Sequence, residues 1–477
     1  MTEAGVEMRS ESDGLGTMEL PAQSYYGVHT ARALANFAIS GIPLSSYPEF
    51  VKALAAVKQA AALTNHELGL LDDLRTEAMV AACTEIRLGL LHGDFVVDVI
   101  QGGAGTSTNM NANEVIANRA LEILGHPRGD YGYLHPIDHV NLSQSTNDSY
   151  PTSIKVALQL QLTDLVGALG ELVDTFRVKA AEFADMVKLG RTQLQDAVPM
   201  TLGQEFGSYA VTLGEDAERL LEARSLLSEI NLGGTAIGTG LNAPYGYREL
   251  VCRNLSEITE LQLRSADDLI EATQDVGAFV QVSGVLKRTA VKLSKICNDL
   301  RLLSSGPRAG FNEINLPAVQ AGSSIMPGKV NPVIPEVVNQ VAFEVVGNDV
   351  TISMAAEAGQ LQLNAFEPII AHSLFTSIRH LDAACSTLDR RCIRGITANP
   401  DTMYSSVVNS IGVITALTPW IGYAAAARIA KQALLTGRAI VDVVVEEKLM
   451  PVNQVTALLQ PEAFTAIPLP PTMNGSS

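Results

Sequence analysis

The sequence predicts a mainly α-helical protein of three domains, built around a long central helical bundle. The 477-residue chain contains 47% hydrophobic but only 5% aromatic residues, an aliphatic balance that favours helices. Apolar residues recur at three- and four-residue spacing over stretches of 20 residues or more. Several such amphipathic helices cannot each bury an apolar face alone, so we expect them to pack lengthwise against one another.

The two ends of the chain are predicted to form smaller domains. Residues 1–148 read as a mixed, mostly helical N-terminal domain with scattered glycine and proline and short helical patterns, as over 50–68. Residues 403–477 read as a small helical C-terminal domain, because Asn399-Pro400 is a break signal. The final residues, PLPPTMNGSS, are typical of a frayed tail.

Residues 149–402 are predicted to form the central bundle. Gly306 is a natural stop for its second long helix, and Pro335 suits the first turn of a third, which continues through the alanine-rich segment near Met354. The apolar positions that define the first two helices each lie on one helix face: Leu158, Leu162, Leu165, Leu169, Leu172 and Phe176, then Val282, Leu286, Ala290, Leu293, Cys297, Leu300 and Leu303.

Charge and cysteine content restrict the partners and the compartment. The net charge of −18 disfavours binding to nucleic acid or to an anionic membrane. The most apolar stretch, residues 411–427, is interrupted by Pro419 and falls short of the roughly 20 residues that span a membrane, so we expect a buried helical segment. Five cysteines without a C-x-x-C pair, and an N-terminus without an apolar run, predict a cytoplasmic protein.

Three loops combine glycine with hydroxyl and amide side chains. The first, residues 102–111, offers backbone N–H groups at its glycines and neutral donors from Thr106, Thr108 and Asn109. It lacks the Gly-Lys-Ser/Thr ending of a phosphate loop and the third glycine of a dinucleotide fingerprint. Taken alone, this loop is better explained as a tight turn capped by threonine and asparagine than as a carboxylate site.

The second loop, residues 143–148, precedes the first long helix with the sequence Ser-Gln-Ser-Thr-Asn-Asp. By itself it is better explained as a helix N-cap and turn than as a binding site. Residues 190–197, which include Thr192 and Gln193, form a polar turn before Pro199 and by themselves indicate only the start of a helix.

The third loop, residues 322–332, favours a functional role. It places two glycines, two prolines, two serines, a lysine and an asparagine between two long helices. Lys329 supplies a compact positive charge and Asn331 a neutral donor and acceptor. Gly322 and Gly328 would allow the loop to close over a small ligand and exclude water.

The histidines carry a weaker signal. His135 and His139, with Asp138 between them, have an H-x-x-x-H spacing that resembles a metal site. Pro136 interrupts the helix that would hold both rings on one face, so metal binding is disfavoured there.

Taken together, these segments resemble the aspartase/fumarase superfamily over nearly the whole chain, and residues 322–332 are similar to its signature loop. Ser145-Thr146-Asn147 and residues 190–197 resemble the aspartase form. Fumarases usually carry two serines before the asparagine, and fumarases and some aspartases place a histidine where Gln193 stands. The resemblance implies the three-domain fold of that superfamily, with a 20-helix core in a homotetramer and active sites that three subunits share.

The resemblance also implies a carbon–nitrogen lyase that reversibly converts L-aspartate into fumarate and ammonia. Ser323 matches the general base that removes the β-carbon proton and produces an enediolate (aci-carboxylate) intermediate. The implied substrate contacts are Thr106, Ser145, Thr146 and Ser324 for the β-carboxylate, Lys329, Asn331 and Thr192 for the α-carboxylate, and Asn147 and Gln193 for the amino group.

No cofactor is implied for the chemistry. Some aspartases are activated by a divalent cation, for which this sequence offers no cluster that can be assigned. Three alternatives stay open. The first is fumarate hydratase on the same scaffold, which Gln193 and Thr146 disfavour. The second is a lyase of the same superfamily that releases a larger amine, such as argininosuccinate lyase or adenylosuccinate lyase. The third is a catalytically silent helical-bundle homologue, which Ser323, Lys329 and Asn331 disfavour.

Overall fold

The computed structural model describes residues 7–322 and 324–459, which divide into two compact units. The first unit draws on Met1–Val166, Glu218–Ala290 and Phe343–Leu381. The second draws on Gly167–Ala217, Val291–Ala342 and Asp382–Ser477. The three-domain division by sequence position stays a prediction.

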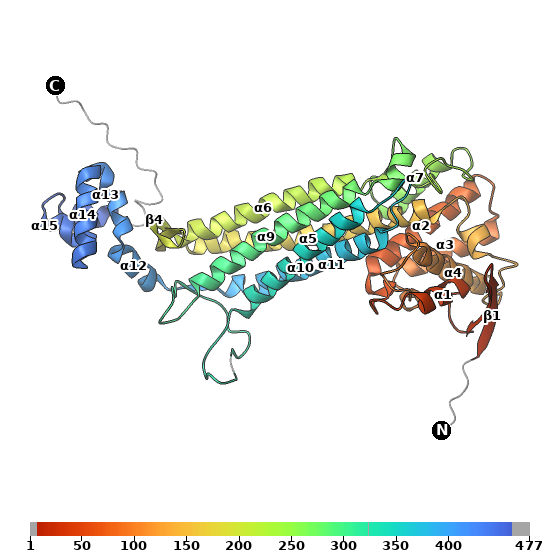
Figure 1. Cartoon of the computed structure of the whole chain (residues 1–477), viewed down its shortest axis with the longest axis horizontal. Helices are drawn as coiled ribbons and strands as arrows, with labels where there is room; N and C mark the ends of the chain where they lie inside the picture. The colour runs from red at the N-terminus through yellow and green to blue at the C-terminus, as the bar shows by residue number, and fades with distance from the viewer. Residues whose placement is uncertain (1–6, 323, 460–477) are drawn as a thin grey trace. The chain divides into compact units, whose positions relative to one another are not determined.

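The mainly α-helical class is confirmed, and the predicted long helices are present (Figure 1). Every apolar position that predicted the first two of them is buried. One of these helices ends at Leu303, three residues before Gly306, and Pro335 lies in the first turn of the next. The long helices are α5 (Thr146–Glu182), α6 (Leu202–Leu226), α9 (Gly277–Leu303), α10 (Val333–Glu357) and α11 (Glu367–Arg391).

The first unit places short helices and a hairpin beside its parts of the long helices. Its shorter elements are β1 (Met8–Asp13) paired antiparallel with β2 (Gly16–Pro21), α1 (Val28–Asn36), α2 (Pro48–Glu67), α3 (Asp73–Arg87), α4 (Thr106–Ile123), α7 (Tyr247–Thr259), α8 (Leu269–Gln274), and β5 (Glu229–Ile230) paired parallel with β6 (Arg264–Ser265). Single turns of 3₁₀ or π helix occur at Leu44–Ser46, His92–Asp94 and Pro136–Val140.

Buried side chains explain how α2 and α4 become fixed in this unit. Helix α2 is rich in alanine and is buried on most of its surface, packing against α3 and α7. On α4, the buried Glu114 carboxylate accepts hydrogen bonds from the backbone N–H groups of Gly27, His29 and Thr30. A carboxylate at these N–H groups satisfies donors that the start of α1 leaves unpaired.

The second unit holds two antiparallel strand pairs and the C-terminal helices. The pairs are β3 (Val187–Thr192) with β4 (Gln195–Thr201), and β7 (Ile314–Asn315) with β8 (Thr397–Ala398). The helices are α12 (Pro400–Asn409), α13 (Ile414–Ile421), α14 (Tyr423–Thr436), α15 (Ile440–Glu446) and α16 (Val452–Leu458), with 3₁₀ turns at Ile393–Gly395 and Ile411–Val413. Val187 and Leu189 of β3 join one apolar core with Val413, Leu417 and Ile429 of these helices.

Helix α5 and the segment 411–427 are the two apolar stretches to compare with the length of a membrane span. Among the described helices, α5 alone has the length and apolar composition to span a membrane, and 56% of its apolar window is buried inside the protein. Such burial is typical of a core helix, because the side chains already pack against protein. Residues 411–427 are helical, as expected: they form a 3₁₀ turn, α13 with Pro419 inside it, and the start of α14. The expected burial holds only for Val413, Ile414, Leu417 and Ala426, because the other side chains of this segment are half-buried or exposed.

Candidate functional site

The first loop turns sharply into α4. Gly105 precedes the helix with φ 88°, and a Cβ there would lie 2.5 Å from the buried Tyr150 ring, so this position requires glycine. Thr106 is the first residue of α4; its hydroxyl donates to the Gly103 carbonyl at 2.8 Å and its side chain is exposed. The Thr106 N–H donates to the same carbonyl at 3.0 Å, so an anion bound by Thr106 would have to replace these two hydrogen bonds.

The second loop meets the first through Asn109, which lies one turn after Thr106 on α4. Asn109 Nδ2 donates to Thr146 Oγ1 at 3.1 Å, and Ser149 Oγ donates to Asn109 Oδ1 at 3.2 Å. Thr146 begins α5. The first unit therefore brings Thr106, Ser145, Thr146 and Asn147 together at the starts of two helices.

A buried carboxylate holds this second loop in shape. Asp148 Oδ1 accepts from the Ser145 N–H at 3.0 Å, and Asp148 Oδ2 accepts from the N–H groups of Gly233 and Thr235 at 3.0 and 2.9 Å. The Asn147 side chain donates to the Ala236 carbonyl at 2.7 Å. These bonds orient the loop before any ligand is present.

The segment 231–240 is a partner of the site that the sequence reasoning missed. The sequence feature that could have identified this segment is its glycine-rich run GGTAIGTG, residues 233–240. Within this run, Thr235 adopts φ 56°. A non-glycine residue with positive φ persists where surrounding contacts over-determine it, and the Asp148 carboxylate supplies such a contact. Ala104, Ser143 and Gln193 also have positive φ, each in a predicted site segment.

Beneath the second loop lies a buried cation. Lys58 on α2 donates to Asn141 Oδ1 at 2.9 Å and to Gln144 Oε1 at 3.0 Å. Burial lowers the pKa of Lys58 to about 7, although the Asp148 charge acts in the opposite direction. Burial raises the pKa of Asp148 to about 6, against the three backbone N–H groups that stabilise its charge.

Residues 190–197 form the turn of a β-hairpin, so their interpretation as a helix start was wrong. Gln193 and Leu194 occupy the two central turn positions with φ 54° and 61°, which matches the twist of paired strands. Helix α6 begins only at Leu202. Thr192 and Gln193 are exposed at the hairpin tip, in the second unit.

An ion-pair cluster anchors the base of this hairpin. The buried Glu313 carboxylate contacts Arg191 at 2.5 Å and Lys188 at 2.8 Å. The Arg191 guanidinium also lies over the Phe311 ring at 4.2 Å. On the other strand, Ser410 donates to the Asp196 carboxylate at 2.7 Å. The hairpin tip therefore projects from a rigid base.

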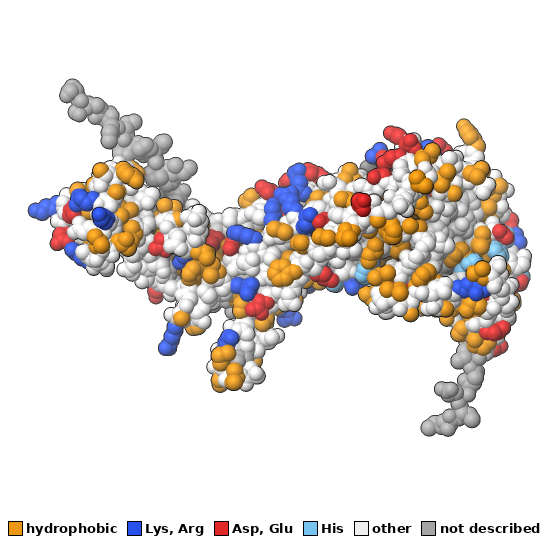
Figure 2. Space-filling model, viewed as in Figure 1, with side chains coloured by type: hydrophobic (Ala, Val, Ile, Leu, Met, Phe, Trp, Pro, Cys, Tyr) orange, Lys and Arg blue, Asp and Glu red, His pale blue; other side chains and the backbone are white. Residues whose placement is uncertain are grey.

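The third loop is closed at its base and exposed along its length. The Gly322 N–H donates to the Lys329 carbonyl at 2.9 Å, and Asn331 Nδ2 donates to the Gly322 carbonyl at 2.6 Å. Residues 324–330, including Ser324 and Lys329, are exposed. In Figure 1 the loop projects from its neighbours, and Figure 2 shows hydrophobic side chains gathered near its tip. Ser323 lies outside the described residues.

The histidine pair makes local contacts. His139 Nδ1 accepts a hydrogen bond from the His135 N–H at 2.8 Å, and His135 Nδ1 accepts from the Ile137 and Asp138 N–H groups. Within 7–322 and 324–459, His, Cys, Asp and Glu form no group of three or more that could hold a metal ion.

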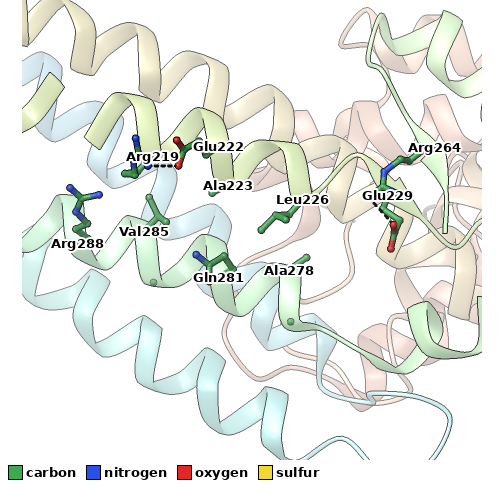
Figure 3. A pocket seen from close by; sticks show the side chains of 12 residues that line it. Arg219, Glu222, Ala223, Leu226, Glu229, Arg264, Ala278, Gln281, Val285 and Arg288 are labelled. Carbon is green, nitrogen blue, oxygen red and sulfur yellow. Dashed lines mark ion pairs between the residues drawn. The ribbon is translucent and has the colours of Figure 1, made fainter. Parts of the chain in front are cut away.

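A separate groove of about 870 Å³ lies between α6 and α9 in the first unit (Figure 3). Arg219 forms an ion pair with Glu222 at 2.7 Å, and Arg264 with Glu229 at 2.9 Å. The groove includes none of the predicted substrate contacts, so it is distinct from the candidate site.

Comparison with known proteins identifies relatives over nearly the whole chain. A family model described as Lyase matches residues 16–347, and one described as Fumarase C C-terminus matches residues 413–466. Aspartate ammonia-lyase from Pseudomonas aeruginosa is 59% identical over 459 residues, covering 96% of this chain and 97% of that protein. Aspartate ammonia-lyase from Escherichia coli K12 is 55% identical, with 93% of each chain covered.

Solved structures give the same picture. The cobalt-bound crystal structure of a fumarate lyase:delta crystallin from Brucella melitensis has a TM-score of 0.94 and 54% identity, covering 97% of this chain and all of that chain. Class II fumarase from Schistosoma mansoni has a TM-score of 0.90 and 34% identity, covering 95% and 98%. The fold is therefore shared by relatives that are named for different activities.

Proposed function

The chain belongs to the lyase family of the aspartase/fumarase superfamily, and from this premise we propose that it catalyses the reversible elimination of ammonia from L-aspartate to give fumarate. One observation carries the proposal: the relatives at 55–59% identity, aligned over 93–98% of this chain, are named aspartate ammonia-lyase. Thr146 and Gln193 support the same choice, because both resemble the aspartase form.

The reaction places one demand above the others on the site. Removing a β-carbon proton builds a second negative charge on the neighbouring carboxylate, so the site must stabilise an enediolate as it forms. Hydroxyl and backbone donors at Thr106, Ser145, Thr146 and Ser324 are proposed to surround that carboxylate. Donors that Asn109 and Asp148 hold in place need little reorganisation when the charge develops.

The remaining roles follow from charge and hydrogen-bonding capacity. Lys329, Asn331 and Thr192 are proposed to bind the α-carboxylate, because an ammonium and neutral donors match a carboxylate. Asn147 and Gln193 supply amide oxygens for the amino group. Ser323 is proposed to take the β-carbon proton after the site has stabilised its alkoxide.

Closure of the loop 322–332 is proposed to accompany binding. Ile325 is 82% exposed, and Met326 is exposed as well. Moving such apolar side chains out of water would favour the closed loop and would exclude water from the charged intermediate.

We assign the assembly to a homotetramer whose active sites combine residues from three subunits. On α10, Phe343, Val346, Val350 and Met354 lie on one helix face, and Phe343 and Met354 are 66% and 68% exposed. An apolar stripe at this spacing is typical of helices that pack against other helices. Copies of the same chain are the proposed partners. Light scattering after size exclusion should give four times the chain mass of 50.7 kDa, and Val350→Asp should lower that mass.

The proposed chemistry requires no cofactor. Ser323 takes the β-carbon proton, the electron pair left on the β-carbon forms the C=C bond of fumarate, and the C–N bond breaks with its electron pair leaving on ammonia, so no oxidant or reductant is needed. Activation by a divalent cation stays a proposal without assigned ligands. A cytoplasmic location is proposed as well, since the five cysteines are free and buried.

One assay separates the possible reactions. The protein is incubated with L-aspartate or with L-malate, and fumarate is followed by its ultraviolet absorbance. Fumarate from L-aspartate alone is the expected result. Fumarate from L-malate alone would identify a fumarate hydratase. Fumarate from neither substrate would indicate a lyase for a larger amine or a catalytically silent homologue.

A further inference from the structure

A series of hydrogen bonds connects the buried Lys58 side chain to the hydroxyl of Thr146. Asn141 Oδ1 accepts from Lys58 Nζ at 2.9 Å, from Asn109 Nδ2 at 3.0 Å and from Asn113 Nδ2 at 3.2 Å. Asn109 Nδ2 then donates to Thr146 Oγ1 at 3.1 Å. Lys58, Asn109 and Asn113 are buried, whereas Asn141 and Thr146 are half-buried, so these hydrogen bonds run from the protein interior to a half-buried hydroxyl.

Lys58 indicates which atom of the Asn141 amide accepts the first hydrogen bond of this series. An ammonium group has donors only, so the Asn141 atom that faces it must be the carbonyl oxygen. A neutral amine could also accept a hydrogen bond, but Asn141 Nδ2 donates to the Gln144 carbonyl at 3.2 Å, which leaves Oδ1 facing Lys58. The Lys58 ammonium and the Gln144 carbonyl together fix the orientation of the Asn141 amide.

The orientation of the Asn141 amide also determines which atom of Asn109 faces Thr146. Since Asn141 presents its oxygen, Asn109 must turn its NH₂ group toward it, and the same NH₂ group faces Thr146 Oγ1. Ser149 Oγ donates to the oxygen on the other side of the Asn109 amide at 3.2 Å, which agrees with this orientation. Thr146 Oγ1 thus accepts from within the protein, and its single O–H hydrogen is available for a substrate carboxylate.

We propose that Asn109 is a positioning residue that polarises the Thr146 hydroxyl as a donor to the substrate β-carboxylate, with Lys58 and Asn141 fixing the direction. The inference rests on the proposed function, because it assigns a task to Thr146 in that reaction. A donor aimed in advance at the carboxylate strengthens as the enediolate charge grows. Asn109 should therefore affect kcat more than KM.

The variant Asn109→Asp tests the direction of the bond. Its carboxylate would accept the Thr146 hydrogen and turn it away from the substrate, and we expect kcat to fall about a hundredfold, as for loss of an oxyanion donor. Asn109→Leu removes the donor without supplying an acceptor, so its loss should be nearer tenfold. Asn118→Asp is the matched control, because it places the same charge at another buried asparagine of α4, whose NH₂ group donates to the Tyr25 carbonyl and the Tyr131 hydroxyl and not to Asn141 or Thr146.

A double-mutant cycle with Thr146→Val distinguishes positioning from a general effect of charge or folding. If Asn109 acts through Thr146, adding Asn109→Asp to Thr146→Val should lower kcat by less than threefold further. Multiplying losses, or an equal loss of kcat in a folded Asn118→Asp, would overturn the proposal. The circular dichroism spectrum and melting temperature of each variant show whether it folds. If Asn109→Asp fails to fold, Asn109→Leu is used in its place in the cycle with Thr146→Val. A wild-type protein inactive on L-aspartate would instead refute the proposed function itself.

Discussion

The two groups of candidate substrate contacts are built in opposite ways. Residues 145–149 are held by buried partners, among them Asp148 and Asn109, whose bonds reach α4 and the segment 231–240. The loop 322–332 is closed at its base, and its side chains from 324 to 330 are exposed. The first region has its geometry before a ligand arrives, whereas the second is the part for which closure over the substrate is proposed. Charge stabilisation needs fixed donors, and exclusion of water needs a part that moves.

The largest effect on kcat is expected for Ser323, in the loop 322–332. Ser323→Ala should lower kcat by about 10³-fold or more, because the proposed base is removed, while binding of fumarate should change little. Steady-state rates and fumarate binding by calorimetry measure the two effects. Equal activity in this variant would refute the base assignment.

A smaller effect is expected at the cation of the same loop. Lys329→Met should raise KM about 10- to 100-fold, because a charge-assisted hydrogen bond to the α-carboxylate is lost. Lys329→Arg keeps the charge and serves as the matched control. An unchanged KM in Lys329→Met would contradict the anchor role.

Two glycines sharpen the comparison between the regions. A Cβ at Gly105 would meet the buried Tyr150 ring, and Gly105→Ala should lower the free energy of unfolding by about 1–3 kcal/mol.

A Cβ at Gly322 would lie 2.3 Å from the Lys329 carbonyl, so Gly322→Ala should distort an exposed loop and reduce kcat/KM about a hundredfold.

The melting temperature should separate these two variants. Gly322→Ala should leave it within a few degrees of the wild type, because the altered loop contributes little buried surface. Gly214→Ala on α6 is the control, since a Cβ there meets nothing within 4 Å. A large loss of stability in Gly322→Ala would show that the loop base is part of the folded core.

The smallest effect concerns pH and the buried cation. The pKa of Lys58 falls from 10.5 to about 7 in the folded protein, so between these values the unfolded chain binds more protons at this residue. Lys58 therefore opposes folding below pH 7, and this cost is relieved as the pH rises. Between pH 7.5 and 9.5, the melting temperature of the wild type should rise relative to that of Lys58→Met. A constant difference would contradict the burial argument.

The sequence determined much of the helical framework, because helix periodicity is a local property. The apolar runs of 158–176 and 282–303 are the buried faces of α5 and α9, and Pro335 lies in the first turn of α10. The composition of the loops likewise identified the candidate site residues, whose roles stay predictions. Local patterns failed at residues 190–197, where pairing between two strands, and not the turn composition, decided the structure.

The tertiary structure alone decided which polar groups face one another. Lys58 and Asn141 are 83 positions apart, and Asp148 and Gly233 are 85 apart, so no window of sequence links them. Each sequence position is compatible with many partners, and burial selects one set because an unsatisfied polar group inside the protein is costly. The helices follow from spacing along the chain, whereas the direction of each buried hydrogen bond follows from packing between distant segments.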